Sequence, residues 1–176
     1  MKRTVAALLS SLLCICGTGV TAQTMGSGTR ETPADSPDAM FVQQASVSGT
    51  AEVELSRIAV RQAQSAQVRR FAQDMLQEHE RNNRELMTIA AHENIAAPPN
   101  LIDDAHAQLR AQLSVMHGGD FDRAYMDAMR EDHEKLAVLL RSSQATVSTP
   151  ELRRYIATTL PVVQDHLQMA ESVHLE

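Results

Sequence analysis

A helical spacing of apolar side chains runs through almost the whole chain after Pro37 and is the feature that most constrains the fold. Apolar and small residues recur at steps of three and four, which places them on one face of a helix. The chain has three phenylalanines, two tyrosines and no tryptophan, so its core must be built from Leu, Ala, Val, Ile and Met. This spacing and composition predict helices, and no strand pattern, nucleotide-binding glycine loop or repeat competes with them.

Caps and helix breakers divide the pattern. Asp38 is a candidate N-cap for the first long helix, and Gly49 inside that helix marks a place where it could break. Ser65 can cap a second long helix, which the sequence "AAPPN" at 96–100 ends. These signals predict one helical hairpin that turns near residue 65.

The second half of the chain repeats this arrangement after a connection. A short helix is predicted at about 103–116, and Asp120 is a candidate cap for the third long helix. Pro150 suits the first position of the last helix, whereas Pro161 falls inside that helix and is expected to kink it. The chain therefore predicts an all-α fold, a ferritin-like four-helix bundle with a long crossover that contains a short extra helix.

The N-terminus has the layout of a secretory signal at residues 1–22. Lys2 and Arg3 precede an apolar stretch at 5–16 that is too short to span a bilayer, and small residues ending at Ala22 suit cleavage. Residues 23–37, rich in Gly, Ser, Thr and Pro, predict a disordered linker, which leaves the bundle domain at 38–174. We expect an exported protein, located in the periplasm of a Gram-negative host.

Cleavage changes which chemistry the mature protein can carry. It removes both cysteines, Cys14 and Cys16, so disulfides, thiolate metal sites and cysteine nucleophiles are excluded. It also removes two positive charges, which takes the formal net charge from −6 to −8. Such an acidic protein lacks the basic footprint of a nucleic-acid partner. No second long apolar run follows, so no transmembrane helix is expected in the mature chain.

Each predicted long helix carries one polar residue on its inward face: Glu52, His79, His133 and His166. Counted from the turn near residue 65, Glu52 and His79 both lie roughly 20 Å along their helices. Counted from the turn near residue 148, His133 and His166 lie roughly 22 to 27 Å along theirs. All four side chains are therefore expected at one level near the middle of the bundle.

One carboxylate and three imidazoles at one level predict a site for a single transition metal, with Zn, Fe, Mn or Cu as candidates. Asp132 fits the inward row as well as His133 does, and we favour His133. A buried structural network is the alternative, with Arg57, Arg81 and Arg84 as partners for the acids. The acids that precede the histidines, Glu78, Asp132 and Asp165, are candidates to orient the rings.

Other polar and sulfur-bearing residues lie near this level or on the surface. Met75, Met129 and Met169 are each spaced about one turn from a histidine. Thioethers are soft ligands, so copper enters the list of metals, although the stronger interpretation is that these methionines fill the core. Tyr125 and Tyr155 are expected in the core. The histidines without a partner set are predicted on the surface: His92, His106, His117 and His174.

Three segments together resemble a known family: "GTAEVELSRIAVRQAQSAQVRRFAQDMLQEHERNNREL", "FDRAYMDAMREDHEKL" and "LRRYIATTLPVVQDHLQMA". They are similar to the domain-of-unknown-function family 4142, exported bacterial proteins regarded as ferritin-like and often labelled as membrane proteins. The resemblance covers residues 38–172 and implies the same four positions, Glu52, His79, His133 and His166. It implies no reaction.

One departure from ferritins limits the chemistry. Di-iron bundles place a glutamate three residues before a histidine on two helices. Here Leu76, Arg130 and Val163 occupy those positions, so a single metal with histidine-rich coordination is predicted instead.

We expect a metal-binding protein for storage, sensing or redox protection, and favour a non-enzymatic role. The alternatives are an envelope stress or interaction protein with a structural polar layer, and a small metal-dependent redox enzyme. No protein partner is indicated.

Overall fold

The computed structural model describes residues 32–96 and 101–175. The predicted signal peptide and most of the predicted linker lie outside these residues. The described residues form five helices and no strand, which confirms the all-α prediction. The helices are α1 (Pro37–Gln62), α2 (Ala66–His92), α3 (Asp104–Val115), α4 (Gly118–Ser143) and α5 (Pro150–Ser172).

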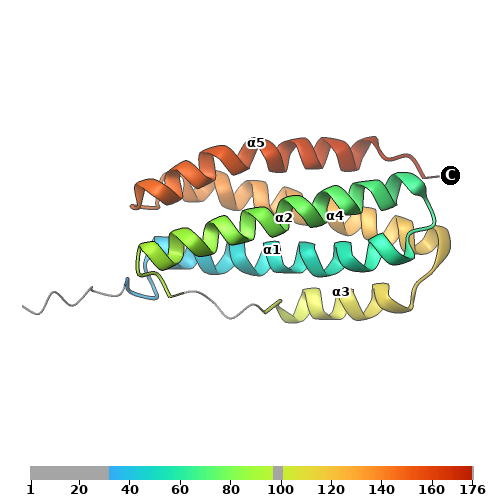
Figure 1. Cartoon of the computed structure of the whole chain (residues 1–176), viewed down its shortest axis with the longest axis horizontal. Coiled ribbons are helices and arrows are strands. Elements are labelled where there is room, and N and C mark those ends of the chain that lie inside the picture. The colour runs from blue at the N-terminus through green and yellow to red at the C-terminus, as the bar shows by residue number, and fades with distance from the viewer. Residues whose placement is uncertain (1–31, 97–100, 176) are drawn as a thin grey trace, which may run out of the picture.

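The four long helices form a bundle in which α1 pairs with α2 and α4 with α5 (Figure 1). The two short turns lie at opposite ends of the bundle, so α2 and α4 run in the same direction (Figure 1). The crossover between them carries α3, which packs along α1 and α4. The predicted four-helix bundle with a long crossover and a short extra helix is therefore confirmed.

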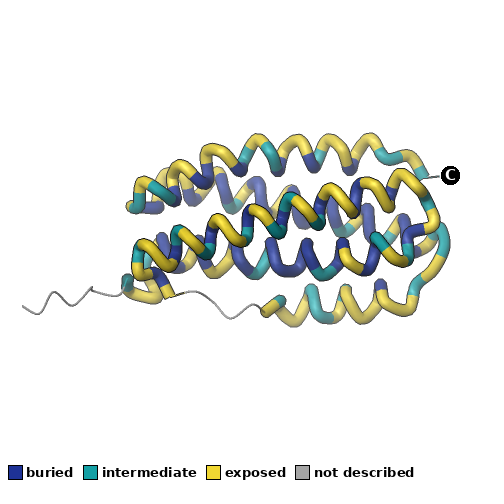
Figure 2. Tube along the Cα trace, viewed as in Figure 1, coloured by how far each residue is buried: buried dark blue, intermediate teal, exposed yellow. Residues whose placement is uncertain are grey.

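The inward faces of the long helices are buried (Figure 2), and the buried apolar residues form two separate clusters. One cluster, near the start of α1, includes Phe41, Leu86, Leu140 and Ile156. The other, near the turn between α1 and α2, includes Leu55, Phe71, Phe121, Tyr125 and Met129. In every long helix, the predicted polar position falls between the residues of the two clusters. The core is thus apolar at both ends and polar in the middle.

The start of α1 differs from the prediction. Ser36 caps the helix by accepting a hydrogen bond from the backbone of Ala39, and Pro37 occupies the first helical position. Asp38 is not the cap. Its buried carboxylate accepts hydrogen bonds from the backbone and hydroxyl groups of Ser148 and Thr149, at 2.5 to 3.1 Å. Asp38 therefore ties the start of α1 to the turn between α4 and α5.

A second buried carboxylate makes the equivalent connection at the opposite end. Asp122 of α4 accepts hydrogen bonds from the backbone N–H groups of Gln64 (3.0 Å) and Ser65 (2.7 Å) in the α1–α2 turn. Helix α4 begins at Gly118, earlier than predicted, and Asp120 lies in its first turn rather than at its cap. Hydrogen bonds thus join the two helical hairpins to each other at each end of the bundle.

Helix α1 continues through Gly49 without a break. A Cβ atom at this position would lie 2.0 Å from Oδ1 of Asn83, so the glycine lets the Asn83 side chain of α2 approach the α1 backbone closely. Close packing of the two helices offsets the cost of glycine in a helix interior, which is about 1 kcal/mol relative to alanine.

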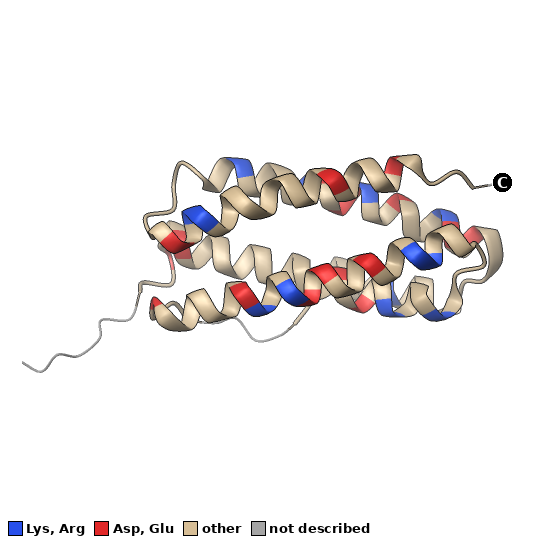
Figure 3. Cartoon of the chain, turned by 45° about the horizontal axis from the view of Figure 1, so that its top comes forward, with Lys and Arg blue, Asp and Glu red and all other residues tan. Residues whose placement is uncertain are grey.

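Acidic and basic residues both occur along the helices (Figure 3). Several form exposed pairs, for example Arg110 with Glu54 at 2.5 Å and Arg57 with Glu80 at 2.6 Å. Within residues 32–96 and 101–175, none of the helices has both the length and the apolar character needed to cross a bilayer.

We expect Asp122→Ala to lower the free energy of unfolding by about 1.5 to 3 kcal/mol, because two partly buried N–H groups lose a charged acceptor. Urea unfolding of the metal-free protein at pH 7 measures this. Asp120→Ala is the matched control, since this carboxylate is largely exposed and pairs with Arg123 on the surface. Equal losses in the two variants would contradict the role of Asp122.

Candidate metal centre

The four predicted residues all lie in the polar layer between the apolar clusters. Glu52 of α1 and His133 of α4 have no exposed surface, and His79 of α2 and His166 of α5 are 2% and 5% exposed. Each helix turns its apolar stripe inward, and these residues occupy positions within that stripe. The axial position predicted by counting residues from the turns therefore agrees with the position of the four side chains in the structure.

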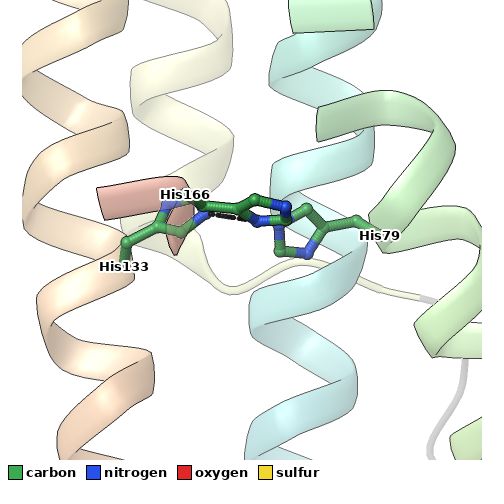
Figure 4. Close-up of side chains that lie close together, drawn as sticks. All are labelled: His79, His133 and His166. Atoms are coloured by element: carbon green, nitrogen blue, oxygen red, sulfur yellow. Dashed lines mark hydrogen bonds between the residues drawn. The ribbon is translucent and has the colours of Figure 1, made fainter. Parts of the chain in front are cut away.

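The three histidine rings point toward one another from α2, α4 and α5 (Figure 4). Nε2 of His133 lies 3.4 Å from Nε2 of His79 and 3.4 Å from Nδ1 of His166. One nitrogen from each ring falls in a group whose members all lie within 4.8 Å of one another. The separations of 3.4 Å are long for hydrogen bonds, which have a usual length of about 2.7 to 3.2 Å.

The backbone orients the ring of His133. Its Nδ1 lies 2.8 Å from the carbonyl oxygen of Met129, one turn earlier in α4. A carbonyl can only accept, so Nδ1 carries the proton and donates it. The lone pair of Nε2 is therefore free and faces His79 and His166.

Glu52 lies on the other side of the His133 ring from this group. Its Oε1 is 3.3 Å from Nδ1 of His133, but the N–H of that nitrogen is donated to the Met129 carbonyl. Among the described residues, neither carboxyl oxygen of Glu52 has a hydrogen-bond partner. Glu52 therefore adjoins the three histidines without joining the group of converging nitrogens.

Asp132 and His133 occupy different environments although they are adjacent in α4. His133 completes the inward layer, whereas Asp132 faces a groove beside α3. There Asp132 lies 3.5 Å from His106, which also contacts Asp103 at 2.8 Å. The prediction that His106 lacks partners is thus wrong, because Asp103 at the start of α3 lies beside the ring and the packing of α3 brings the ring to Asp132 of α4.

The arginines proposed for a structural network lie outside the layer. Arg57 pairs with Glu80, and Arg81 pairs with Glu78, in both cases on the surface. Glu78 therefore does not orient His79. No arginine of the described residues forms an ion pair with the carboxyl group of Glu52.

The sulfur atoms and tyrosines near the layer have unequal surroundings. Met75 and Met129 are fully buried in the apolar cluster, whereas Met169 is 37% exposed, so the three thioethers do not share one environment. Tyr125 is buried, and its hydroxyl lies 2.9 Å from the Ser56 hydroxyl. Tyr155 is also in the core, as expected, and burial raises its pKa to about 12.

Burial keeps the imidazoles neutral. It lowers the pKa of His133 to about 4 and that of His166 to about 4, and it holds the pKa of His79 well below 6.5, with a further contribution from the neighbouring imidazoles. Burial also raises the pKa of Glu52 well above its usual range, and the Asp132 charge adds to this effect. Neutral imidazoles offer lone pairs without competition from protons.

This arrangement can hold a metal ion. Ligand nitrogens about 2.0 to 2.1 Å from a tetrahedral zinc ion are about 3.3 to 3.4 Å apart. The separations of 3.4 Å between the His133 nitrogen and its two neighbours match that value. The group contains three nitrogens and no thiolate, a set that suits zinc, copper, iron or nickel.

Comparison with known families gives one extended match. The family model described as "Domain of unknown function (DUF4142)" matches residues 23–173. A search of curated proteins finds no match.

Several solved structures share the fold. A DUF305 fragment from Deinococcus radiodurans aligns with a TM-score of 0.69 and 17% identity over 80% of this chain and 95% of its own. A DUF305 protein from Streptomyces coelicolor, described as a candidate secreted protein, aligns with a TM-score of 0.68 and 18% identity over 78% and 91%. CopM in a Cu(I)-bound form aligns with a TM-score of 0.64 and 16% identity over 76% and 92%. At these identities the likeness concerns the fold alone.

We expect the metal-free protein to lose stability as the pH falls from about 6.5 to about 4. In this range the unfolded chain protonates His133 and His166 whereas the folded chain does not, so protonation favours unfolding. Thermal unfolding between pH 7 and pH 4 measures the loss. His92→Ala should not reduce this loss, because the exposed His92 ring pairs with Glu93, which raises rather than lowers its pKa. Histidine resonances of the core that titrate near pH 6.5 would contradict the expectation.

Proposed function

The chain belongs to the DUF4142 family, and we propose that it binds one transition-metal ion in the middle of its helical bundle. The proposed ligands are the ring nitrogens of His79, His133 and His166, and Glu52 is the adjacent carboxylate. The four predicted residues are therefore proposed with two different roles: the histidines bind the ion, and Glu52 balances its charge.

The observation that carries the proposal is the convergence of three buried imidazole nitrogens. The rings contact one another at 3.4 Å, which is longer than a usual hydrogen bond, so these contacts compensate poorly for the cost of burying three polar groups at one level of the core. The contact between His133 and the Met129 carbonyl leaves one lone pair directed at the other two rings. A metal ion would satisfy all three lone pairs together.

Copper is the first metal to test. Nitrogen sites bind Cu²⁺ more strongly than the other divalent first-row metals, and imidazole is a suitable ligand for it. CopM, which has a similar fold, has been described in Cu(I)-bound and Cu(II)-bound forms, and this supports copper as a candidate. Zinc, iron and manganese remain alternatives from the ligand set. Sequestration of the ion is the role that such a buried site favours.

Glu52 has two opposite effects under this proposal. Without a metal it is a buried carboxyl group with no hydrogen-bond partner, which lowers stability. With a metal, its negative charge lies close to one ligand ring and offsets the charge of the ion. This position resembles that of the carboxylates that orient and polarise metal-bound histidines.

The proposed setting is the cell envelope. The charged start, the short apolar stretch and the small residues ending at Ala22 support export and cleavage, with residues 38–174 as the bundle domain. The description of the Streptomyces coelicolor DUF305 protein as a candidate secreted protein agrees with export. A periplasmic location is the corresponding proposal for a Gram-negative host.

We expect the purified protein to bind one equivalent of copper tightly, and His133→Ala to weaken that affinity by more than about 100-fold, since losing a ligand costs more than losing an outer-shell partner. Equilibrium dialysis against a copper-chelator competitor, followed by metal analysis, measures both. His92→Ala is the control and should bind as the wild type does. Equal affinities for the wild type and His133→Ala would refute the site and favour a purely structural layer.

We expect Glu52→Gln to stabilise the metal-free protein at pH 7 and yet to weaken copper binding by about 10- to 100-fold. The pKa of Glu52 is raised by folding, so wild-type stability falls as the pH rises above about 4.5, and the glutamine variant lacks this loss. Thermal unfolding at pH 5 and pH 8 and the same dialysis measure the two effects. A destabilised variant with unchanged affinity would contradict both roles of Glu52.

A further inference from the structure

A groove of about 320 Å³ runs beside the crossover helix, between α1, α3 and α4. Its walls include Val47 of α1 and Leu136 and Leu139 of α4, and its polar end is formed by His106 and Asp103 with Asp132. The groove and the three buried histidines lie on different sides of α4, because Asp132 points into the groove and His133 points into the bundle.

One carboxyl oxygen in this groove has no hydrogen bond. Asp132 is 7% exposed, and its Oδ2 is without a hydrogen-bond partner among the described residues. The nearest polar group is Nε2 of His106, at 3.5 Å, which is too long for a good hydrogen bond. Its other oxygen, Oδ1, lies 3.6 Å from the ammonium group of Lys135, a side chain that is 64% exposed. A nearly buried carboxylate thus keeps a free oxygen directed at an imidazole.

The opposite edge of the His106 ring is fixed by a second carboxylate. Nδ1 of His106 lies 2.8 Å from Oδ1 of Asp103, which also accepts the backbone N–H of His106 at 2.9 Å. A carboxylate can only accept, so Nδ1 carries the proton in this contact. In the neutral ring Nε2 then has a free lone pair, and it faces Asp132. Carboxylates hold many metal-binding histidines in this way.

We propose that Nε2 of His106 and Oδ2 of Asp132 hold a second divalent metal ion in this groove, with Asp103 as a positioning residue. In a tetrahedral zinc site, nitrogen and oxygen ligands lie about 3.3 to 3.5 Å apart, which matches the separation of 3.5 Å between these two atoms. With two protein ligands, the ion keeps further positions for water or for a ligand from the groove. The ion is bound more weakly than by three histidines.

The alternative occupant is a proton. An imidazolium at His106 between two carboxylates would form ion pairs at both ring nitrogens, and the two carboxylates, Asp132 foremost, raise the pKa of His106. The two occupants differ in one respect that can be measured. A zinc ion binds the lone pair of Nε2 directly, whereas a proton on Nε2 occupies that lone pair and leaves none for zinc.

Zinc titration at pH 8, followed by ¹⁵N resonances of the histidine rings in the wild-type protein, tests the proposal. We expect Nε2 of His106 to shift on addition of zinc while the ring of His92, which has one carboxylate neighbour at 2.8 Å, does not shift. An unchanged His106 resonance at saturating zinc would overturn the proposal and leave the protonated triad as the explanation.

Calorimetric zinc titration of variants separates this site from the one in the core. In the His166→Ala background, where the three-histidine set is broken, one weak equivalent should remain, and it should be lost when His106→Ala or Asp132→Asn is added. Asp103→Asn should weaken it by about 10- to 100-fold. His92→Ala should not change it. Retention of the weak equivalent in His166→Ala/His106→Ala would overturn the groove site, whatever the core binds.

Discussion

The structure depends on a polar layer that is buried between two apolar clusters. Transferring imidazole and carboxyl groups from water into such an interior costs free energy unless each finds a partner. Here the rings of His79, His133 and His166 turn toward one another, and burial keeps them neutral. The lone pairs that result face a common point. The layer therefore costs free energy in the metal-free bundle, and its three nitrogens lie close enough together to be able to hold a metal ion.

The layer can form because the helices are held in a fixed axial register. Asp38 joins the start of α1 to the α4–α5 turn, and Asp122 joins α4 to the α1–α2 turn. These two carboxylates lie at opposite ends of the bundle and prevent the hairpins from sliding past each other. A displacement of one helical turn, about 5.4 Å, would separate the histidine nitrogens beyond any shared ion.

Two adjacent residues of α4 face two different sites. His133 points into the bundle, whereas Asp132 points into the groove that α3 closes from outside. Adjacent positions in a helix are rotated by about 100°, so one helix can contribute to both sites. The crossover helix therefore has a role beyond linking the hairpins, because it brings His106, with Asp103 beside it, to Oδ2 of Asp132 in α4.

Much of this was accessible from the sequence. The periodicity of apolar residues determined the helices and their order, and counting residues from the turns determined the common depth of Glu52, His79, His133 and His166, because the rise of a helix per residue is constant. The family resemblance, confirmed by the match over residues 23–173, pointed to the same four positions. Helix starts were less accurate, since Asp38 and Asp120 satisfy the pattern of a cap without serving as one.

Only the tertiary structure decided how the side chains are directed around the bundle axis. The rotation of α4 places His133 rather than Asp132 in the layer, and the Met129 carbonyl selects the nitrogen that faces the other rings. Glu52 shares their depth but lies on the far side of the His133 ring. The contact of His106 with Asp132 also comes from packing, because α3 and α4 are brought together by contacts that no local spacing encodes. Depth is a local property of each helix, whereas convergence is a property of all of them.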